Sequence, residues 1–106
     1  MAQLRMTTPR LLVLEALLRD HERESYGLEL AQVAGLEPGT IYPILVAFEG
    51  AGWLRSRAED VDVHAAGRPR RRYYVLTPAG VEAAGAAVAK AAARRKAPRT
   101  TGELAW

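Results

Sequence analysis

The most constraining feature of the sequence is a short amphipathic segment at residues 38–53. Its large apolar residues, Ile41, Ile44, Leu45 and Phe48, follow the i, i+3, i+4, i+7 spacing of one face of an α-helix. The opposite face is small and mildly polar, so it can lie close against a partner. A helix this short needs other helices to bury its apolar face. The segment therefore predicts a small helical domain built around it.

The start of this helix has two interpretations. If Thr40 caps the helix, Pro43 lies at the third helical position, where its missing N–H costs nothing. If the helix begins earlier, Pro43 removes one hydrogen bond and bends the first turn. Gly50 and Gly52 mark the end of the helix in either case.

The length of 106 residues predicts one domain with a single core. The chain has no cysteine, which excludes disulfides and cysteine-ligated metals and fits a reducing cytosol. Residues 1–9 lack the apolar core of a signal peptide. The apolar run at residues 11–18 is interrupted by Glu15 and is too short to span a bilayer. We therefore expect a soluble cytoplasmic protein.

Two further helices are predicted before the central one. Residues 4–19 form the first, with either Thr7 or Thr8 as its cap. The second begins at Tyr26 or Gly27, with Ser25 as a candidate cap, and ends near residue 35. Helix, tight turn and helix is the outline of a helix-turn-helix, although such helix pairs also occur in many proteins that do not bind DNA.

A basic hairpin is predicted after the central helix. Residues 53–57 and 72–76 have strand-type composition, and the loop between them carries turn signals. Four arginines stand within residues 68–72, which is either the electrostatic footprint of a polyanion binder or a solvated charged loop. Three helices with a basic hairpin make a winged helix-turn-helix. The expected fold is thus mainly α with a small β-hairpin wing.

A last helix is predicted at residues 78–96, with Thr77 as its cap and Pro78 at its first position. This segment is rich in alanine and has only two larger aliphatic residues, Val81 and Val88. Such a helix either lies alone on the surface or packs closely against another helix. We expect a winged-helix DNA-binding domain at residues 1–77, a dimerisation helix at 78–96 and a flexible tail at 97–106.

Four blocks of residues, taken together, resemble the PadR family of bacterial transcription regulators. They are Tyr-Gly-Leu-Glu-Leu at 26–30, Gly-Thr-Ile-Tyr-Pro-Ile-Leu at 39–45, Glu-Gly-Ala-Gly-Trp-Leu at 49–54 and Gly-Arg-Pro-Arg-Arg-Arg-Tyr-Tyr-Val-Leu-Thr at 67–77. The resemblance implies a winged-helix homodimer that represses promoters, with the first and last helices in the dimer contact. It also leaves room for a small-molecule effector between these two helices, of unknown identity.

Two features differ from the usual pattern of that family. Its recognition helix often carries Lys or Arg on the outer face, but residues 40–49 contain neither and Glu49 is acidic. Charge-assisted recognition of guanine by this helix is therefore not expected. The C-terminal region is only one helix and a tail, so we expect no separate effector domain.

The expected DNA contacts come from the helix-turn-helix and the hairpin. Thr40 and Tyr42 present hydroxyls where groove contacts are expected, although Thr40 could instead be a cap and Tyr42 a packed aromatic. Tyr26 either reaches a phosphate or is half-buried. The hairpin arginines would neutralise phosphates or enter a minor groove. The full predicted set is Tyr26, Gly39, Thr40, Tyr42, Pro43, Arg55, Arg57, Arg68, Arg70 and Arg71.

The expected dimer contact lies on the apolar faces of the first and last helices. Its predicted residues are Leu11, Leu14, Leu18, Val81, Ala84, Val88 and Ala91.

We expect neither an enzyme nor a metal or cofactor site. His21 and His64 lie in predicted loops without ligand spacing, and the acidic residues 59–62 lack the pattern of a calcium loop. The hypothesis is a homodimeric repressor that binds double-stranded DNA at a palindromic operator. The alternative is a protein-interaction or anti-repressor module of the same fold that does not bind DNA.

Overall fold

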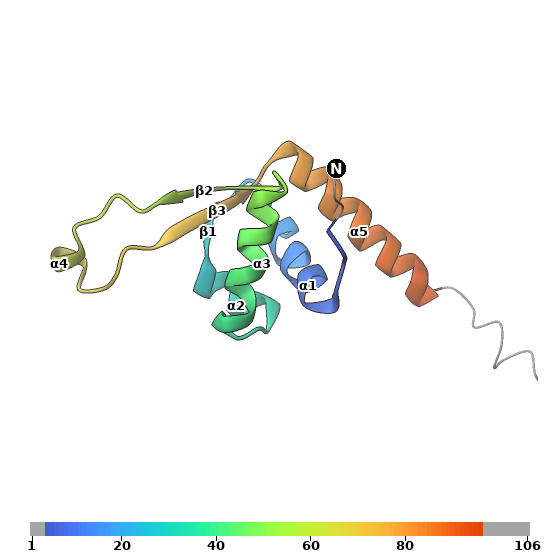
Figure 1. The fold of residues 1–106 in the computed structure, drawn as a ribbon, viewed down its shortest axis with the longest axis horizontal. Coiled ribbons are helices and arrows are strands. Elements are labelled where there is room, and N and C mark those ends of the chain that lie inside the picture. The colour runs from blue at the N-terminus through green and yellow to red at the C-terminus, as the bar shows by residue number, and fades with distance from the viewer. Residues whose placement is uncertain (1–3, 97–106) are drawn as a thin grey trace, which may run out of the picture.

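The computed structural model describes residues 4–96 and is mainly helical, with one small sheet (Figure 1). The sheet is antiparallel, with strand order β1-β3-β2. The predicted fold class is thus confirmed, while the expected tail at 97–106 lies outside the described residues. The elements in chain order are α1 (Thr8–Leu18), β1 (Ser25–Tyr26), α2 (Gly27–Ala34), α3 (Pro38–Gly50), β2 (Leu54–Ala58), α4 (Val63–Ala66), β3 (Arg72–Leu76) and α5 (Pro78–Lys96).

The first helix starts later than predicted. Thr7 caps α1, because its hydroxyl accepts a hydrogen bond from the backbone N–H of Arg10 at 3.3 Å. Residues 4–7 precede the helix and run along α5 in Figure 1. The prediction of a helix from residue 4 was wrong by one turn, and Thr7 is the correct cap of the two candidates.

The second helix begins at Gly27, and its cap differs from the prediction. Ser25 does not cap α2, because it lies in β1 and pairs with Tyr74 of β3. At the other end, Gly35 adopts the left-handed conformation with φ of 72°, which ends the helix as predicted.

The central helix α3 begins before Thr40, so the second of the two interpretations is correct. Glu37 is the N-cap residue and Pro38 the first helical residue, which places Thr40 inside the first turn. Pro43 therefore stands within the helix, and the carbonyl of Gly39 lacks its usual donor four residues on.

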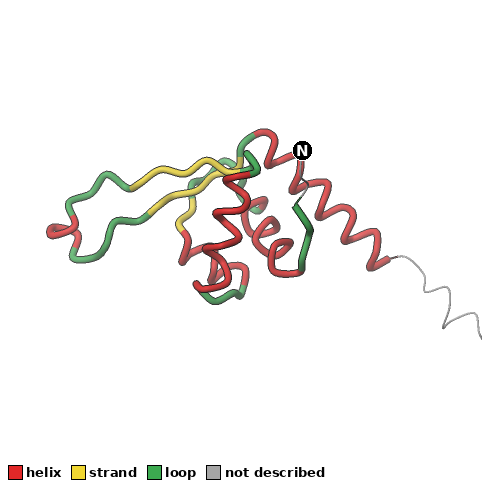
Figure 2. Tube along the Cα trace, viewed as in Figure 1, coloured by secondary structure: helices red, strands yellow, loops and turns green. Residues whose placement is uncertain are grey.

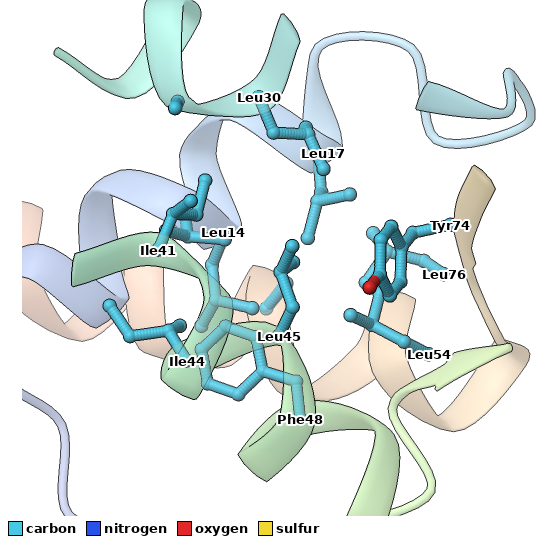
Figure 3. Close-up of a cluster of buried hydrophobic side chains, with 13 residues drawn as sticks. Leu14, Leu17, Leu30, Ile41, Ile44, Leu45, Phe48, Leu54, Tyr74 and Leu76 are labelled. Carbon is cyan, nitrogen blue, oxygen red and sulfur yellow. The ribbon is translucent and has the colours of Figure 1, made fainter. Parts of the chain in front are cut away.

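The apolar face of α3 forms the centre of the core. The largest fully buried side chains are those of Phe48, Leu14, Ile41, Leu45 and Val13, from α1 and α3. Figure 3 shows these helices facing Leu54, Tyr74 and Leu76 of the sheet. The i, i+3, i+4, i+7 pattern read from the sequence is thus the side of α3 that holds the domain together.

The hairpin of β2 and β3 projects from the helical body as a long wing (Figures 1 and 2). Its register runs from Leu54 opposite Leu76 to Ala58 opposite Arg72. The predicted loop at the tip contains the short helix α4, where Asp62 accepts a hydrogen bond from the N–H of His64 at 2.9 Å and Gly67 ends the turn with φ of 67°.

The last helix packs on the domain by its first half and extends beyond it by its second half (Figure 1). Thr77 caps α5 as predicted, since its hydroxyl accepts from the N–H of Gly80 at 3.0 Å and donates to the carbonyl of Gly52 at 2.7 Å. Gly80 and Ala84 are buried, and Ala87 packs against the core from the same face. Within residues 4–96, none of the helices has the length and apolarity needed to cross a membrane.

Candidate nucleic-acid interface

The outer face of α3 is exposed and partly apolar, and Glu49 is the charged residue of this helix. Gly39, Thr40 and Pro43 are exposed, and Tyr42 and Val46 retain 43% and 69% of their accessible surface. Tyr42 and Val46 are four residues apart, so they lie side by side on the helix surface. This face offers a hydroxyl-bearing aromatic ring and an aliphatic side chain to a partner.

Tyr42 is not free to move in every direction, because its ring lies against Gly27 at the start of α2. A Cβ atom added at Gly27 would be 2.6 Å from a ring carbon of Tyr42. The ring is therefore packed on one side and exposed on the other. Tyr42 is therefore a packed aromatic on one side, and its exposed side leaves the groove contact as a prediction.

The acidic residue of α3 is turned toward the sheet. The hydroxyl of Ser56 donates to Glu49 at 2.7 Å, and the guanidinium of Arg72 donates to the same hydroxyl at 2.9 Å. The negative charge of Glu49 is thus held beside a positive one. Glu49 follows Val46 by three residues and lies on the same exposed side of α3, but its carboxylate is already engaged by the hydroxyl of Ser56.

Arg68, the first of the hairpin arginines, is bound within the wing. Its guanidinium donates to both carboxylate oxygens of Glu59, at 2.7 and 3.0 Å. Glu59 also accepts from the backbone N–H of Arg71 and the hydroxyl of Tyr73, each at 3.2 Å. The Arg68 hydrogen bond is the main reason that the pKa of Glu59 falls to about 2. Glu59 thus organises the outer end of the two strands, where the tip loop begins, a role that the sequence did not reveal.

Arg70 and Arg71 are held more loosely. Arg70 donates to the carbonyl of Val61 at 3.2 Å, while the guanidinium of Arg71 lies over the ring of Tyr26, 4.1 Å from its centre. Tyr26 is half-buried and meets Tyr73 edge-on, with ring centres 5.9 Å apart. The structure therefore joins Tyr26 of the helix-turn-helix to the wing through Arg71.

The two arginines of β2 differ from each other. Arg57 forms two hydrogen bonds of 2.7 Å with Glu24, and this contact is the main cause of the lowered pKa of Glu24. Its guanidinium also lies 5.1 Å from the ring centre of Tyr73. Arg55 is exposed on the same strand, two residues away.

The predicted dimer residues divide into a buried and a partly exposed group. Leu14 and Ala84 are completely buried in the core of the protomer, so they support the helices from within. The remaining five keep part of their surface open: Leu11, Leu18, Val81, Val88 and Ala91.

A groove of about 440 Å³ lies between the segment before α1 and the helix α5. Its apolar lining includes Leu11 and Ala91, and its rim carries Arg5, Lys90 and Arg94. This is the position between the first and last helices where an effector was expected. Among the residues that the structure describes, no group of three His, Asp or Glu side chains is arranged to hold a metal ion.

Solved structures of bacterial proteins share this fold. The protein smu.1704 from Streptococcus mutans has a TM-score of 0.66 and 24% identity, over 89% of this chain and 87% of that one. A PadR family transcription regulator from Clostridium difficile has a TM-score of 0.62 and 24% identity, over 84% of this chain and 90% of that one. MepR from S. aureus, in complex with DNA, has a TM-score of 0.64 and 14% identity, over 86% of this chain and 68% of that one.

The sequence itself also matches a family model. None of the curated proteins matches it, but the model of the PadR-like family of transcriptional regulators matches residues 13–86. These residues run from α1 into α5 and include the helix-turn-helix, the sheet and the whole wing. The chain therefore belongs to the PadR-like family of transcriptional regulators.

Proposed function

We propose that this protein is a sequence-specific repressor that binds double-stranded DNA as a homodimer on a palindromic operator. The observation that carries the proposal is the exposed outer face of α3, with Tyr42 and Val46 at its centre and its acidic residue Glu49 hydrogen-bonded to Ser56, beside a wing that carries arginines. The structure of S. aureus MepR in complex with DNA, which shares this fold, supports DNA as the partner here.

In this proposal α3 of each protomer enters the major groove. Tyr42 and Thr40 supply hydroxyl contacts, and Val46 and the Tyr42 ring contact thymine methyl groups. Gly39 and Pro43 keep the start of the helix slim enough for close approach. Arg55, Arg70 and Arg71 contact phosphates. Arg57 and Arg68 can do so only after they release the carboxylates of Glu24 and Glu59.

The partner protomer would be held by the open residues on α1 and α5. Val88 and Ala91 lie on the half of α5 that extends beyond the domain, where a second copy of the helix can pack through small side chains. We assign any effector to the groove beside Ala91 and Arg94, because a ligand there would contact α1 and α5, the two helices that we expect in the dimer contact.

The test is selection of bound fragments from a genomic DNA library by the purified protein, followed by footprinting. We expect a protected inverted repeat with half-sites about one helical turn apart. A reporter under the selected promoter should then be more active in a strain lacking the protein. Increased expression only when the protein is present would instead mean an activator.

A second candidate is a protein-interaction module that does not bind DNA. It is favoured by the two arginines that already have carboxylate partners, Arg57 with Glu24 and Arg68 with Glu59. Failure to enrich any fragment over random DNA at about 150 mM salt would support this candidate.

A further inference from the structure

A notch of about 320 Å³ separates α2 from the wing. One wall is α2 with Leu28, which is half exposed although it is apolar, and the other wall is the wing with Pro69. The lining of the notch thus combines apolar side chains with positive charge. Its lining residues are Tyr26, Leu28, Gln32, Arg68, Pro69, Arg70 and Arg71.

The positive charges of the notch are not equivalent. Arg68 is neutralised by Glu59, whose side chain is largely buried. Arg70 and Arg71 have no carboxylate within ion-pair distance in residues 4–96. Arg71 is nevertheless held in place, because its guanidinium face rests on the ring of Tyr26. A planar guanidinium stacked in this way keeps its N–H edge available to an anion.

The position of the notch suggests its ligand. If α3 occupies a major groove and the wing tip the next minor groove, the DNA strand between these grooves has to pass between the helix-turn-helix and the wing. An exposed leucine and a proline suit the apolar face of a deoxyribose, and two unneutralised arginines suit the phosphate beside it.

We propose, on the basis of the proposed function, that this notch binds one sugar-phosphate unit of that strand, with Arg71 fixed by the Tyr26 ring as the phosphate ligand. In this arrangement Tyr26 is a positioning residue that acts through its ring. Its hydroxyl, which the sequence suggested as the phosphate contact, is not required.

The experiment replaces single operator phosphates with neutral methylphosphonates and measures affinity at constant salt. For the wild-type protein, we expect one position in each half-site where the replacement weakens binding about tenfold, the effect of one charge-assisted contact. Arg71→Ala should bind the unmodified operator about tenfold more weakly and should no longer respond to the replacement at that position.

Two substitutions of Tyr26 separate the ring from the hydroxyl. Tyr26→Phe should behave as the wild type, and Tyr26→Leu should lose the response as Arg71→Ala does. Circular dichroism melting checks that the Tyr26→Leu protein is folded. If that variant is unfolded, Arg71→Ala still tests the phosphate site. Arg72→Ala is the matched control, because Arg72 is the neighbouring arginine but lies outside the notch. It should retain the full response.

Each contrary result has a distinct meaning. An undiminished response in Arg71→Ala would overturn the phosphate site, and loss of the response in Tyr26→Phe would overturn the role of the ring. Both results leave operator binding by the wild type intact. Absence of specific binding by the wild type would refute the proposed function itself.

Discussion

Gly80 shows how much a single missing side chain can matter in this domain. It lies where the first turn of α5 meets the turn between α3 and β2, and a Cβ atom there would overlap the carbonyl oxygen of Trp53. That carbonyl also accepts the N–H of Thr77 at 3.0 Å, so the backbone cannot easily withdraw. We expect Gly80→Ala to lower the free energy of unfolding by about 1–3 kcal/mol, as overpacking does.

Urea denaturation of Gly80→Ala and Gly85→Ala would test this expectation. Gly85 lies on the same helix with nothing near its Cβ position. Gly85→Ala should therefore raise the free energy of unfolding by about 0.5–1 kcal/mol through helix propensity. A stabilising effect of Gly80→Ala would show that α5 does not approach Trp53 this closely.

Val46 is the most exposed large apolar side chain of α3. If it contacts a thymine methyl, replacing that thymine with uracil removes the contact without changing the hydrogen-bonding groups of the base. We expect one such replacement per half-site to weaken wild-type binding about threefold to tenfold, and Val46→Ala to be insensitive to it. Equal sensitivity of both proteins, in competition assays on matched duplexes, would exclude Val46 as the contact.

The sequence contained the signal for Val46 but not for the ion pairs. The helical period that identified Ile41 and Phe48 as the buried face also assigns Val46 to the opposite face. By contrast, Arg57 meets Glu24 from 33 positions away. Charge patterning along a chain cannot reveal a pair that only the folded sheet brings together, so Arg57 and Arg68 were predicted as DNA contacts without their carboxylate partners.

At the scale of elements, Glu59 ties the two sides of the wing together. Glu59 accepts hydrogen bonds from Arg68, Tyr73 and the backbone of Arg71, and its pKa of about 2 lies below the ordinary value of 4.5. Because the pKa of Glu59 is lower in the folded protein, its carboxylate stabilises the fold fully at any pH above the pKa that it has in the unfolded chain. This stabilisation is lost as the pH falls from about 4.5 to about 2.

Comparison of the wild type with Glu59→Gln isolates this contribution. At pH 7 we expect the variant to have the lower melting temperature. The difference should shrink steadily as the pH is lowered below 4.5, because protonation of the wild-type carboxyl removes the same interaction. Thermal melts followed by circular dichroism across this range provide the measurement. A difference that does not change with pH would show that Glu59 acts through its shape and not through its charge.

The short elements were beyond reach of sequence patterns for a physical reason. Apolar residues extend over several turns of α1 and α3, and α5 has a clear cap and a long alanine-rich run, so each was predicted with its cap or end near the observed one. The strand β1 has two residues and α4 has four. Neither is long enough to show a period, and β1 exists only because β3 offers it an edge.

At the scale of the whole molecule, the protomer has its wing and the outer half of α5 on opposite sides of the helical body (Figure 1). The outer half of α5 carries Val88, which is partly exposed and the last of its larger aliphatic residues. A charged side chain at this position would have to be desolvated if two copies of α5 pack together. We therefore expect Val88→Glu to convert the proposed dimer into a folded monomer.

The effect on DNA binding follows from the linkage of two half-sites. In a dimer, the second protomer binds at the effective concentration set by the first, which commonly raises affinity by 10²–10⁴. Val88→Glu should therefore weaken binding to the full operator by about a hundredfold or more and leave binding to an isolated half-site unchanged. Sedimentation equilibrium tests the oligomeric state, and titration of the full operator and of the isolated half-site tests the affinity.

The control is Ala89→Glu, the adjacent position on an exposed face of α5, which should remain dimeric. A Val88→Glu protein that still sediments as a dimer would move the interface away from the outer half of α5, whereas a monomer with full operator affinity would refute the linkage between dimer and operator.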